Sequence, residues 1–217
     1  MNTPEGLDFI YRSVYDKHMG EKNNAKQNIL DSALELFSAK GYEGVAVSEL
    51  TAAAGITKPT LYYYFDSKEG LFDAVCKENY DRLNKVVANS AVYYANPENY
   101  HEDIYKTLCN VAAAYFSFAF GNTAFYRLAM ANLYMPRSSV VFDAVRKYHF
   151  EQYEIIGKMF QDMANYHGNL RGKENQLAWS FIGAINTHVA HNSNSDEKSS
   201  EDIKKEFVHQ FMHGIYA

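Results

Sequence analysis

Cysteine, proline and tryptophan are scarce in this chain, which has two, four and one of them among its 217 residues. Cys76 and Cys109 form no CxxC spacing, so neither a disulfide framework nor a thiolate metal site is indicated. No apolar run approaches the roughly 20 residues that span a bilayer, and the first residues lack the basic-then-apolar order of a secretory signal. We therefore expect a globular cytoplasmic protein with two buried thiols.

Positive charge is also in short supply, because 21 Lys and Arg residues face 26 Asp and Glu residues and leave a net charge of −5. A protein that coats nucleic acid by charge alone needs an excess of Lys and Arg to neutralise phosphates. Any contact with nucleic acid must therefore be local. The hydrophobic fraction of 47% is ordinary for a folded protein and excludes wholesale disorder.

Helical periodicity dominates the sequence. Apolar residues recur with a period near 3.6, whereas no stretch sustains the alternation of apolar and polar residues that is typical of a strand. We therefore expect an all-α protein without a sheet. The expected helices cover about residues 24–40, 47–54, 58–64, 67–94, 101–120, 122–133, 138–166, 174–191 and 201–214.

Two short helices separated by a glycine indicate a helix-turn-helix. Residues 47–54 place their apolar side chains on one face, and Gly55 then ends the helix, as the tight turn of this motif often requires. Thr57 can cap the second helix, and Pro59 is tolerated in its first turn because the N–H groups there have no intrahelical partner.

The second helix of this motif can pack against its domain and present a free face at the same time. Residues spaced to pack inward are Leu61, Tyr64 and Phe65. Residues left for the other faces are Lys58, Thr60, Tyr62 and Tyr63.

The segment from Gly41 to Leu71, GYEGVAVSELTAAAGITKPTLYYYFDSKEGL, resembles the signature of TetR-family regulators. The match combines G-Y before the first motif helix, A-G-I at the turn, K-P-T-L-Y-x-Y-F through the second helix and S-K-E directly after it. The resemblance covers roughly residues 27–72, and the rest of the chain agrees in length and helical pattern. It implies a homodimer that represses transcription and releases its operator DNA when a small molecule binds, with activation in place of repression left open.

The resemblance also implies the organisation of the chain. An N-terminal extension is expected over residues 1–22, a three-helix DNA-binding domain over 23–68, and a helical ligand-sensing and dimerisation domain over 69–217. Met19 stands where many relatives begin, so the first residue of the protein is left open.

DNA contacts follow from the same resemblance, residue by residue. The positions that face the major groove in the family are occupied here by Lys58, Thr60 and Tyr63, and Pro59 is expected against a thymine methyl. The positions that contact phosphate are occupied by Tyr62 and Lys68. The sequence departs from the family at Val45 and Ala46, where many relatives have threonines that cap the helix and bind phosphate, so that contact is left open.

Aromatic and thioether side chains gather between residues 115 and 135 and could line a cavity. Core packing would use the same residues, and periodicity does not separate the two roles. The residues expected to bind an apolar or amphipathic effector are Tyr115, Phe116, Phe118, Phe125, Tyr126, Met130 and Tyr134. No cofactor is expected.

The last two helices resemble the pair through which the family dimerises as a four-helix bundle. The apolar residues expected at this interface are Trp179, Phe181, Ile182, Ile185, Val189, Phe207 and Phe211. Burial inside one subunit is the alternative for part of this set. Because a two-fold operator needs two reading heads, dimerisation and DNA binding are linked.

A small all-helical enzyme or a haem-type binding protein is the alternative function. His188 with His191, and His209 with His213, are spaced to share a helix face, but no third ligand stands at a readable spacing. The sequence also contains no recognisable nucleophile with its base and no Gly-rich phosphate loop. We therefore expect neither a metal site nor catalytic residues.

Overall fold

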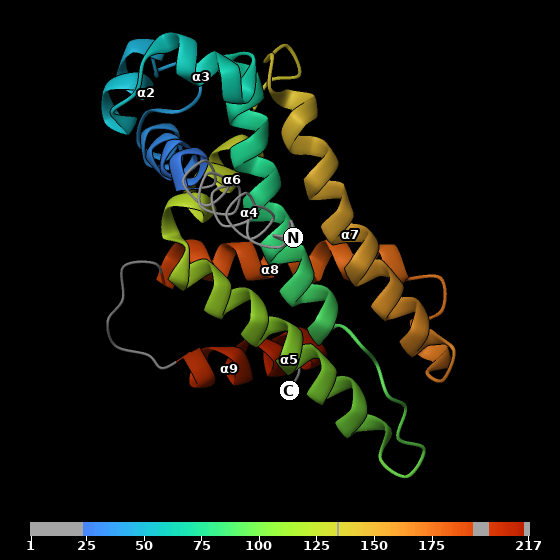
Figure 1. Ribbon diagram of the computed structural model, residues 1–217. Helices are drawn as coiled ribbons and strands as arrows, with labels where there is room; N and C mark the ends of the chain where they lie inside the picture. Colours follow the sequence, from blue (N-terminus) through green and yellow to red (C-terminus); the bar gives the residue numbers. More distant parts are fainter. Residues whose placement is uncertain (1–23, 134, 193–199, 215–217) are drawn as a thin grey trace, which may run out of the picture. The chain divides into compact units, whose positions relative to one another are not determined.

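The computed structural model describes residues 24–133, 135–192 and 200–214 (Figure 1). Within these residues the chain is built from helices joined by loops and turns and contains no strand, which confirms the expected all-α fold. The expected extension over residues 1–22, Met19 and Tyr134 all lie outside the described residues.

The chain divides into two compact units, of which the first ends at Val75 and the second begins at Cys76. The division falls within helix α4, which runs continuously from Lys68 to Ser90. The first unit contains a helix over residues 24–40, α2 (Val47–Ala54), α3 (Lys58–Phe65) and the start of α4. The second contains α5 (Tyr100–Gly121), α6 (Thr123–Leu133), α7 (Phe142–Ala164), the 3-10 helix η1 (Gly168–Leu170), α8 (Glu174–Asn192) and α9 (Ser200–His213).

Aromatic side chains form much of the core of the first unit. The Phe72 ring meets the rings of Phe37 and Tyr42 edge-on, with centroid distances of 5.1 Å and 5.2 Å. The helix over residues 24–40 ends where the sequence predicts, because Gly41 adopts a left-handed φ of 70° and donates its N–H to the Phe37 carbonyl. The helix over residues 24–40 and the start of α4 therefore share one core.

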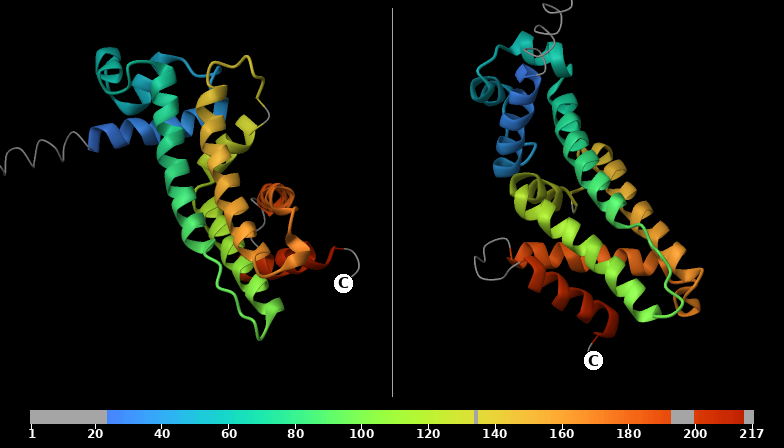
Figure 2. Two further views of the ribbon diagram at one scale, coloured as in Figure 1. Left: turned by 90° about the vertical axis from the view of Figure 1, so that its right-hand side faces the viewer. Right: turned by 60° about the horizontal axis from the view of Figure 1, so that its bottom comes forward.

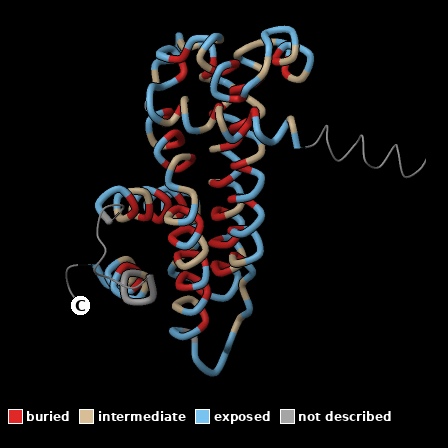
Figure 3. The backbone as a smooth tube through the Cα atoms, turned by 60° about the vertical axis from the view of Figure 1, so that its left-hand side comes forward, coloured by how far each residue is buried: buried red, intermediate tan, exposed pale blue. Residues whose placement is uncertain are grey.

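Packing in the second unit is organised around α5 and α7. Helix α8 packs against both of them, and α9 packs against α5 (Figure 2). In the long helices of this unit the buried positions lie along one side (Figure 3), as expected for amphipathic helices that share a core. Cys76 and Cys109 are buried free thiols, as expected. Across the described ranges, no helix has both the length and the apolar character that crossing a membrane requires.

Helices α4 and α7 each have one end that differs clearly from the expected one. Helix α4 ends at Ser90 and not near residue 94, because the following segment turns away to bond with α5. Helix α7 begins at Phe142 and not at residue 138, because turns with hydrogen bonds to the carbonyls of Pro136 and Ser139 precede it. In both places, competing hydrogen bonds make the helix shorter at that end than periodicity alone indicates.

Candidate functional site

The turn between α2 and α3 has the geometry that a helix-turn-helix requires. Gly55 adopts φ 65° and ψ 32°, and the N–H of Ile56 then donates to the Thr51 carbonyl at 2.9 Å. A side chain with a Cβ is strained at this backbone conformation, which glycine adopts without cost from sterics. The glycine therefore sets the angle between the two helices.

The start of α2 is capped by an acidic side chain in place of a hydroxyl. Ala46 offers no side-chain cap, and its N–H donates to the Glu49 carboxylate at 2.9 Å. Lys40 pairs with the same carboxylate. The pKa of Glu49 is lowered, chiefly by the Ala46 N–H and then by Lys40. A negative charge therefore stands at the start of α2.

Thr57 starts α3, as the sequence predicts. Its hydroxyl oxygen accepts from the Thr60 N–H at 3.4 Å and lies 2.9 Å from the Thr60 hydroxyl. Pro59 lies in the first turn, where its missing N–H leaves no intrahelical bond unmade. The position and start of the second motif helix are thus determined by local contacts.

The two sides of α3 have different environments. Leu61 and Phe65 face the core, with 0% and 5% of their surface exposed. Tyr62 and Tyr63 are 42% and 67% exposed. Tyr64, which was expected to pack inward, is half-buried. The other expected DNA contacts on this helix are also accessible, with Lys58 and Pro59 exposed and Thr60 half-buried.

Lys68, the first residue of α4, is held against the core of the first unit. Its Nζ atom lies 4.1 Å from the centroid of the Tyr42 ring. The Tyr42 hydroxyl in turn donates to the Glu69 carboxylate at 2.7 Å, and burial followed by this bond raises the pKa of Tyr42. Ser67 caps the helix by accepting the Gly70 N–H. The ammonium group therefore has a defined position over the Tyr42 ring.

Most of the residues expected to bind an effector are packed in the core of the second unit. Tyr115, Phe116, Phe118 and Phe125 are each at most 8% exposed. The Tyr115 hydroxyl is buried and has no hydrogen-bond partner among the described residues. Burial raises the pKa of Tyr115 far above its usual value. This phenol is therefore a neutral donor inside an apolar environment.

Two of the expected effector residues, Tyr126 and Met130, line a cavity of about 510 Å³ at the end of α5. Its other lining residues, from α5, α6 and α8, are Ala119, Phe120, Thr123, Arg127, Val189 and Ala190. The Tyr126 hydroxyl donates to the Asn186 side-chain oxygen at 2.5 Å. Sequence reasoning did not select Arg127, because a single charge within an aromatic stretch carries no recognisable pattern.

The apolar residues expected at a dimer interface lie mainly between α8 and the rest of their own unit. Phe181, Ile182, Ile185, Val189 and Phe207 are at most 4% exposed within the single chain. The Phe181 ring contacts Phe207 and Phe211 across α8 and α9, with centroid distances of 5.4 Å and 5.0 Å. Trp179 is the exception, because 59% of its surface is exposed.

Of the paired histidines, His188 packs against aromatic rings, whereas His191, His209 and His213 are exposed. His188 contacts the Phe116 and Phe207 rings, and burial lowers its pKa. The rings of His209 and His213 lie 4.7 Å apart on α9. Among the described residues, no three His, Cys, Asp or Glu side chains are grouped so that they could hold a metal ion.

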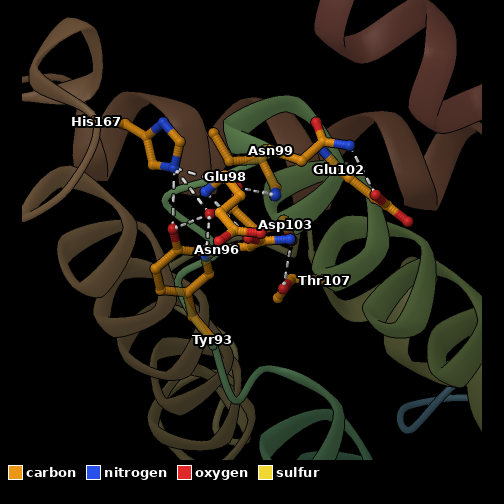
Figure 4. Close-up of polar contacts among 9 residues, drawn as sticks. Tyr93, Asn96, Glu98, Asn99, Glu102, Asp103, Thr107 and His167 are labelled. Atoms are coloured by element: carbon orange, nitrogen blue, oxygen red, sulfur yellow. Dashed lines mark hydrogen bonds and ion pairs between the residues drawn. The ribbon is translucent and has the colours of Figure 1, made fainter.

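A buried polar cluster joins the segment after α4 to α5 and to the segment between α7 and η1 (Figure 4). Asp103 accepts hydrogen bonds from the Tyr93 hydroxyl at 2.6 Å and from the Asn96 N–H at 2.9 Å. His167 Nε2 lies 3.2 Å from the same carboxylate. Burial alone would raise the pKa of Asp103, but these hydrogen bonds and that of the Ile104 N–H outweigh it and lower the pKa. The cluster satisfies a buried charge and gives no sign of a nucleophile.

Comparison with known proteins finds similarity that is concentrated in the first unit. Residues 29–75 match the family model described as bacterial regulatory proteins, tetR family. The biofilm operon icaADBC HTH-type negative transcriptional regulator IcaR of Staphylococcus aureus is 36% identical over 78 residues, which are 36% of this chain and 40% of IcaR. The chain thus matches less than half the length of this curated relative.

Solved structures extend the likeness to the fold of the second unit. The regulator FadR from Bacillus subtilis, solved with stearoyl-CoA, has a TM-score of 0.69 and 18% identity, with 87% of this chain and 98% of FadR covered. AibR, solved with isovaleryl coenzyme A and operator DNA, has a TM-score of 0.67 and 20% identity over 86% of this chain and 97% of AibR. Its helix-turn-helix, the family match over residues 29–75 and this fold make the chain similar to bacterial regulatory proteins of the TetR family.

Proposed function

We propose that this chain is a dimeric DNA-binding repressor that releases its operator when a small molecule binds its second unit. The observation that carries the proposal is the accessible side of α3, where Tyr62 and Tyr63 are exposed while Leu61 and Phe65 anchor the helix. A helix that is fixed on one side and free on the other can enter a major groove. We assign DNA binding to residues 23–68 and effector binding and dimerisation to residues 69–217.

The assigned contacts divide into two kinds. Lys58, Thr60 and Tyr63 are proposed to read base edges, with Pro59 against a thymine methyl, because they stand on or near the accessible side of α3. Tyr62 and Lys68 are proposed to hold phosphates, which fixes the position of the helix without reading sequence. Such local contacts are compatible with the net charge of −5.

Repression as the sign of regulation is supported by the name of IcaR, a negative transcriptional regulator. Binding of an apolar or amphipathic effector is supported by the cavity at Tyr126 and Met130. FadR and AibR, which share the fold, were solved with coenzyme A thioesters. The alternative of an enzyme or a haem-type protein gains no support from these relatives. A regulator that acts on the chromosome would work in the cytoplasm.

Control by an effector requires that it bind the DNA-incompetent state more tightly than the DNA-competent one. We propose α4 as the element that couples the two sites, because one continuous helix carries Lys68 in the first unit and Tyr80 in the second. Tyr80 is buried and its ring meets Phe125 edge-on at 4.9 Å. Changes around α6 can therefore reach the helix that begins at a proposed phosphate contact.

Dimerisation is proposed through the outward sides of α8 and α9. Trp179 is the expected interface residue that remains largely exposed in the single chain. Large exposed aromatic side chains are frequent anchors in protein interfaces. Phe211, which is half-buried, is the second residue of the set that a partner could still contact.

Selection from a random double-stranded DNA library tests the proposal directly. The full chain should enrich a motif with two-fold symmetry, and fluorescence anisotropy should then give a lower Kd for that motif than for a shuffled sequence. The double variant Lys58→Ala with Tyr63→Ala should lose this preference. Lys85→Ala is the matched control, because Lys85 is exposed and lies about five helical turns beyond Lys68 on α4. Failure to enrich any motif would contradict the proposed function.

A further inference from the structure

The cavity between α5, α6 and α8 combines an apolar lining with one cationic side chain. Ala119, Phe120, Met130 and Val189 supply hydrocarbon surface, and the cavity measures about 510 Å³. This volume lies within the range of pockets that hold small molecules, roughly 300–1,000 Å³. Arg127 is part of the same lining. The cavity therefore offers two different kinds of contact to one ligand.

Arg127 is available to an external anion. It is exposed, and it makes no ion pair with an acidic side chain among the described residues. Its planar guanidinium group matches a carboxylate with two parallel hydrogen bonds. The same group at the edge of an apolar surface interacts more strongly with an anion than it would in open water.

Tyr126 adds a polar group on the same helix. It is 5% exposed, lines the cavity and donates its hydroxyl to Asn186 on α8. Burial raises the pKa of Tyr126, so the phenol stays neutral. The lining thus includes a cation and a neutral tyrosine, and among the described residues no carboxylate belongs to it. This charge distribution favours an anionic ligand over a neutral or cationic one.

We propose that this cavity binds an anionic amphiphile, with a carboxylate paired to Arg127 and a hydrocarbon chain against Phe120, Met130 and Val189. The proposal rests on the proposed function, because it names the chemical class of the effector of the second unit. Beyond that function, Arg127 on α6 is the residue that recognises the head group. The apolar contacts supply affinity for the chain, and Arg127 supplies discrimination between head groups.

Isothermal titration calorimetry of the full chain with octanoate, 1-octanol and octylammonium tests the assignment. These probes share one chain length and differ in the charge of the head group. We expect octanoate to bind at least tenfold more tightly than octylammonium, with 1-octanol between them. In Arg127→Ala the affinity for octanoate should fall at least tenfold, whereas that for 1-octanol should stay within about twofold.

Three further variants separate charge from folding and shape. Arg137→Ala removes the same charge from an exposed position outside the cavity lining and should leave all three affinities unchanged. Arg127→Lys should retain part of the preference for octanoate, because it keeps the charge and loses the planar fork. Ala190→Phe should fill the cavity and weaken all three probes together. Circular dichroism should give wild-type helical content for each variant.

Two kinds of result would overturn the assignment. One is an octanoate affinity that is absent in the wild type at millimolar concentration or unchanged in Arg127→Ala. The other is sedimentation in which Arg127→Ala alters self-association but not octanoate binding, since the cavity would then be a contact between copies. DNA binding is measured separately by anisotropy. Intact DNA binding without octanoate binding would leave the repressor proposal standing, and octanoate binding through Arg127 without DNA binding would refute the repressor proposal alone.

Discussion

The Nζ atom of Lys68 lies 4.1 Å from the centroid of the Tyr42 ring, so a proposed phosphate contact rests on an aromatic residue of the core. A cation over an aromatic face is stabilised by about 0.5–1 kcal/mol at exposed sites and by more when it is partly desolvated. Tyr42 is 6% exposed and is itself fixed by Phe37, Phe72 and Glu69. The packing of the domain therefore determines where the Lys68 side chain lies.

Tyr42→Phe should distinguish the contribution of the ring from that of the hydroxyl, because it removes only the hydroxyl. The ring under Lys68 remains, so the dependence of DNA affinity on salt should stay as in the wild type. The lost hydrogen bond to Glu69 should lower the free energy of unfolding by roughly 0.5–1.5 kcal/mol. Urea unfolding and anisotropy over a salt series measure both quantities. If the salt dependence weakens as much as in Lys68→Ala, the hydroxyl and Glu69 position the lysine.

Lys58→Ala and Lys68→Ala should impair DNA binding in different ways. Lys68→Ala should weaken binding to all sequences and flatten the plot of log affinity against log salt by about one unit for each phosphate contact removed per subunit. Lys58→Ala should reduce the difference in binding free energy between the selected motif and an altered motif by about 1–3 kcal/mol. Titration of both variants against both sequences over a salt series checks this. If Lys58→Ala weakens binding to all sequences alike and Lys68→Ala changes the sequence preference, Lys58 contacts phosphate and Lys68 contacts bases.

Asp103→Asn should destabilise the folded protein near neutral pH. Its hydrogen bonds with Tyr93, Asn96 and His167 are replaced by those of a neutral amide, which we expect to cost about 1–3 kcal/mol. Because the folded pKa of Asp103 is lowered, the wild-type carboxylate contributes its full stability above the unfolded pKa of about 3.9 and loses it as the pH falls through the lower folded value.

The difference in unfolding free energy between wild type and Asp103→Asn should therefore shrink as the pH falls below about 4. Chemical denaturation at a series of pH values measures it. Glu35→Gln is the matched control, since Glu35 is exposed and should change stability by no more than about 0.5 kcal/mol. A difference that stays constant over the whole acid range would show that the carboxylate charge is unimportant there.

Tyr115→Phe and Tyr126→Phe remove the same atom from two environments. The Tyr115 hydroxyl is buried without a partner among the described residues, so its removal should be neutral or stabilising by up to about 1 kcal/mol. The Tyr126 hydroxyl bonds to Asn186, so its removal should destabilise by about 1 kcal/mol. Paired thermal and urea unfolding compares the variants. Equal losses in both would mean that Tyr115 has a partner in solution.

Trp179→Asp should weaken dimerisation and leave the fold of each subunit intact, because Trp179 is largely exposed in the single chain. Phe181→Asp should instead unfold the second unit, because it places a charge in a fully buried position. Analytical ultracentrifugation and circular dichroism distinguish the two outcomes. A folded Trp179→Asp variant with wild-type self-association would exclude this residue from the interface.

Features that depend on neighbouring residues follow from the sequence alone. The end of the first described helix at Gly41, the bounds of α2 and the turn at Gly55 are all as expected. Caps, glycine conformations and helical periodicity act within one or two turns, so a short stretch of sequence contains the information. The same holds for the residues that α3 leaves accessible, because Leu61 and Phe65 fix which side faces inward.

Features that depend on distant residues were decided by the tertiary structure. Sequence periodicity could not place the apolar side of α8 inside its own subunit, because a partner helix and a neighbouring helix present the same surface to it. Nor could it end α4 at Ser90, since the segment that follows is held by Asp103, which in turn contacts His167, 64 residues further along the chain. Arg127 gains its place in the cavity only when α5, α6 and α8 meet. Side chains that are far apart in the chain become neighbours only through packing, and no local pattern records that proximity.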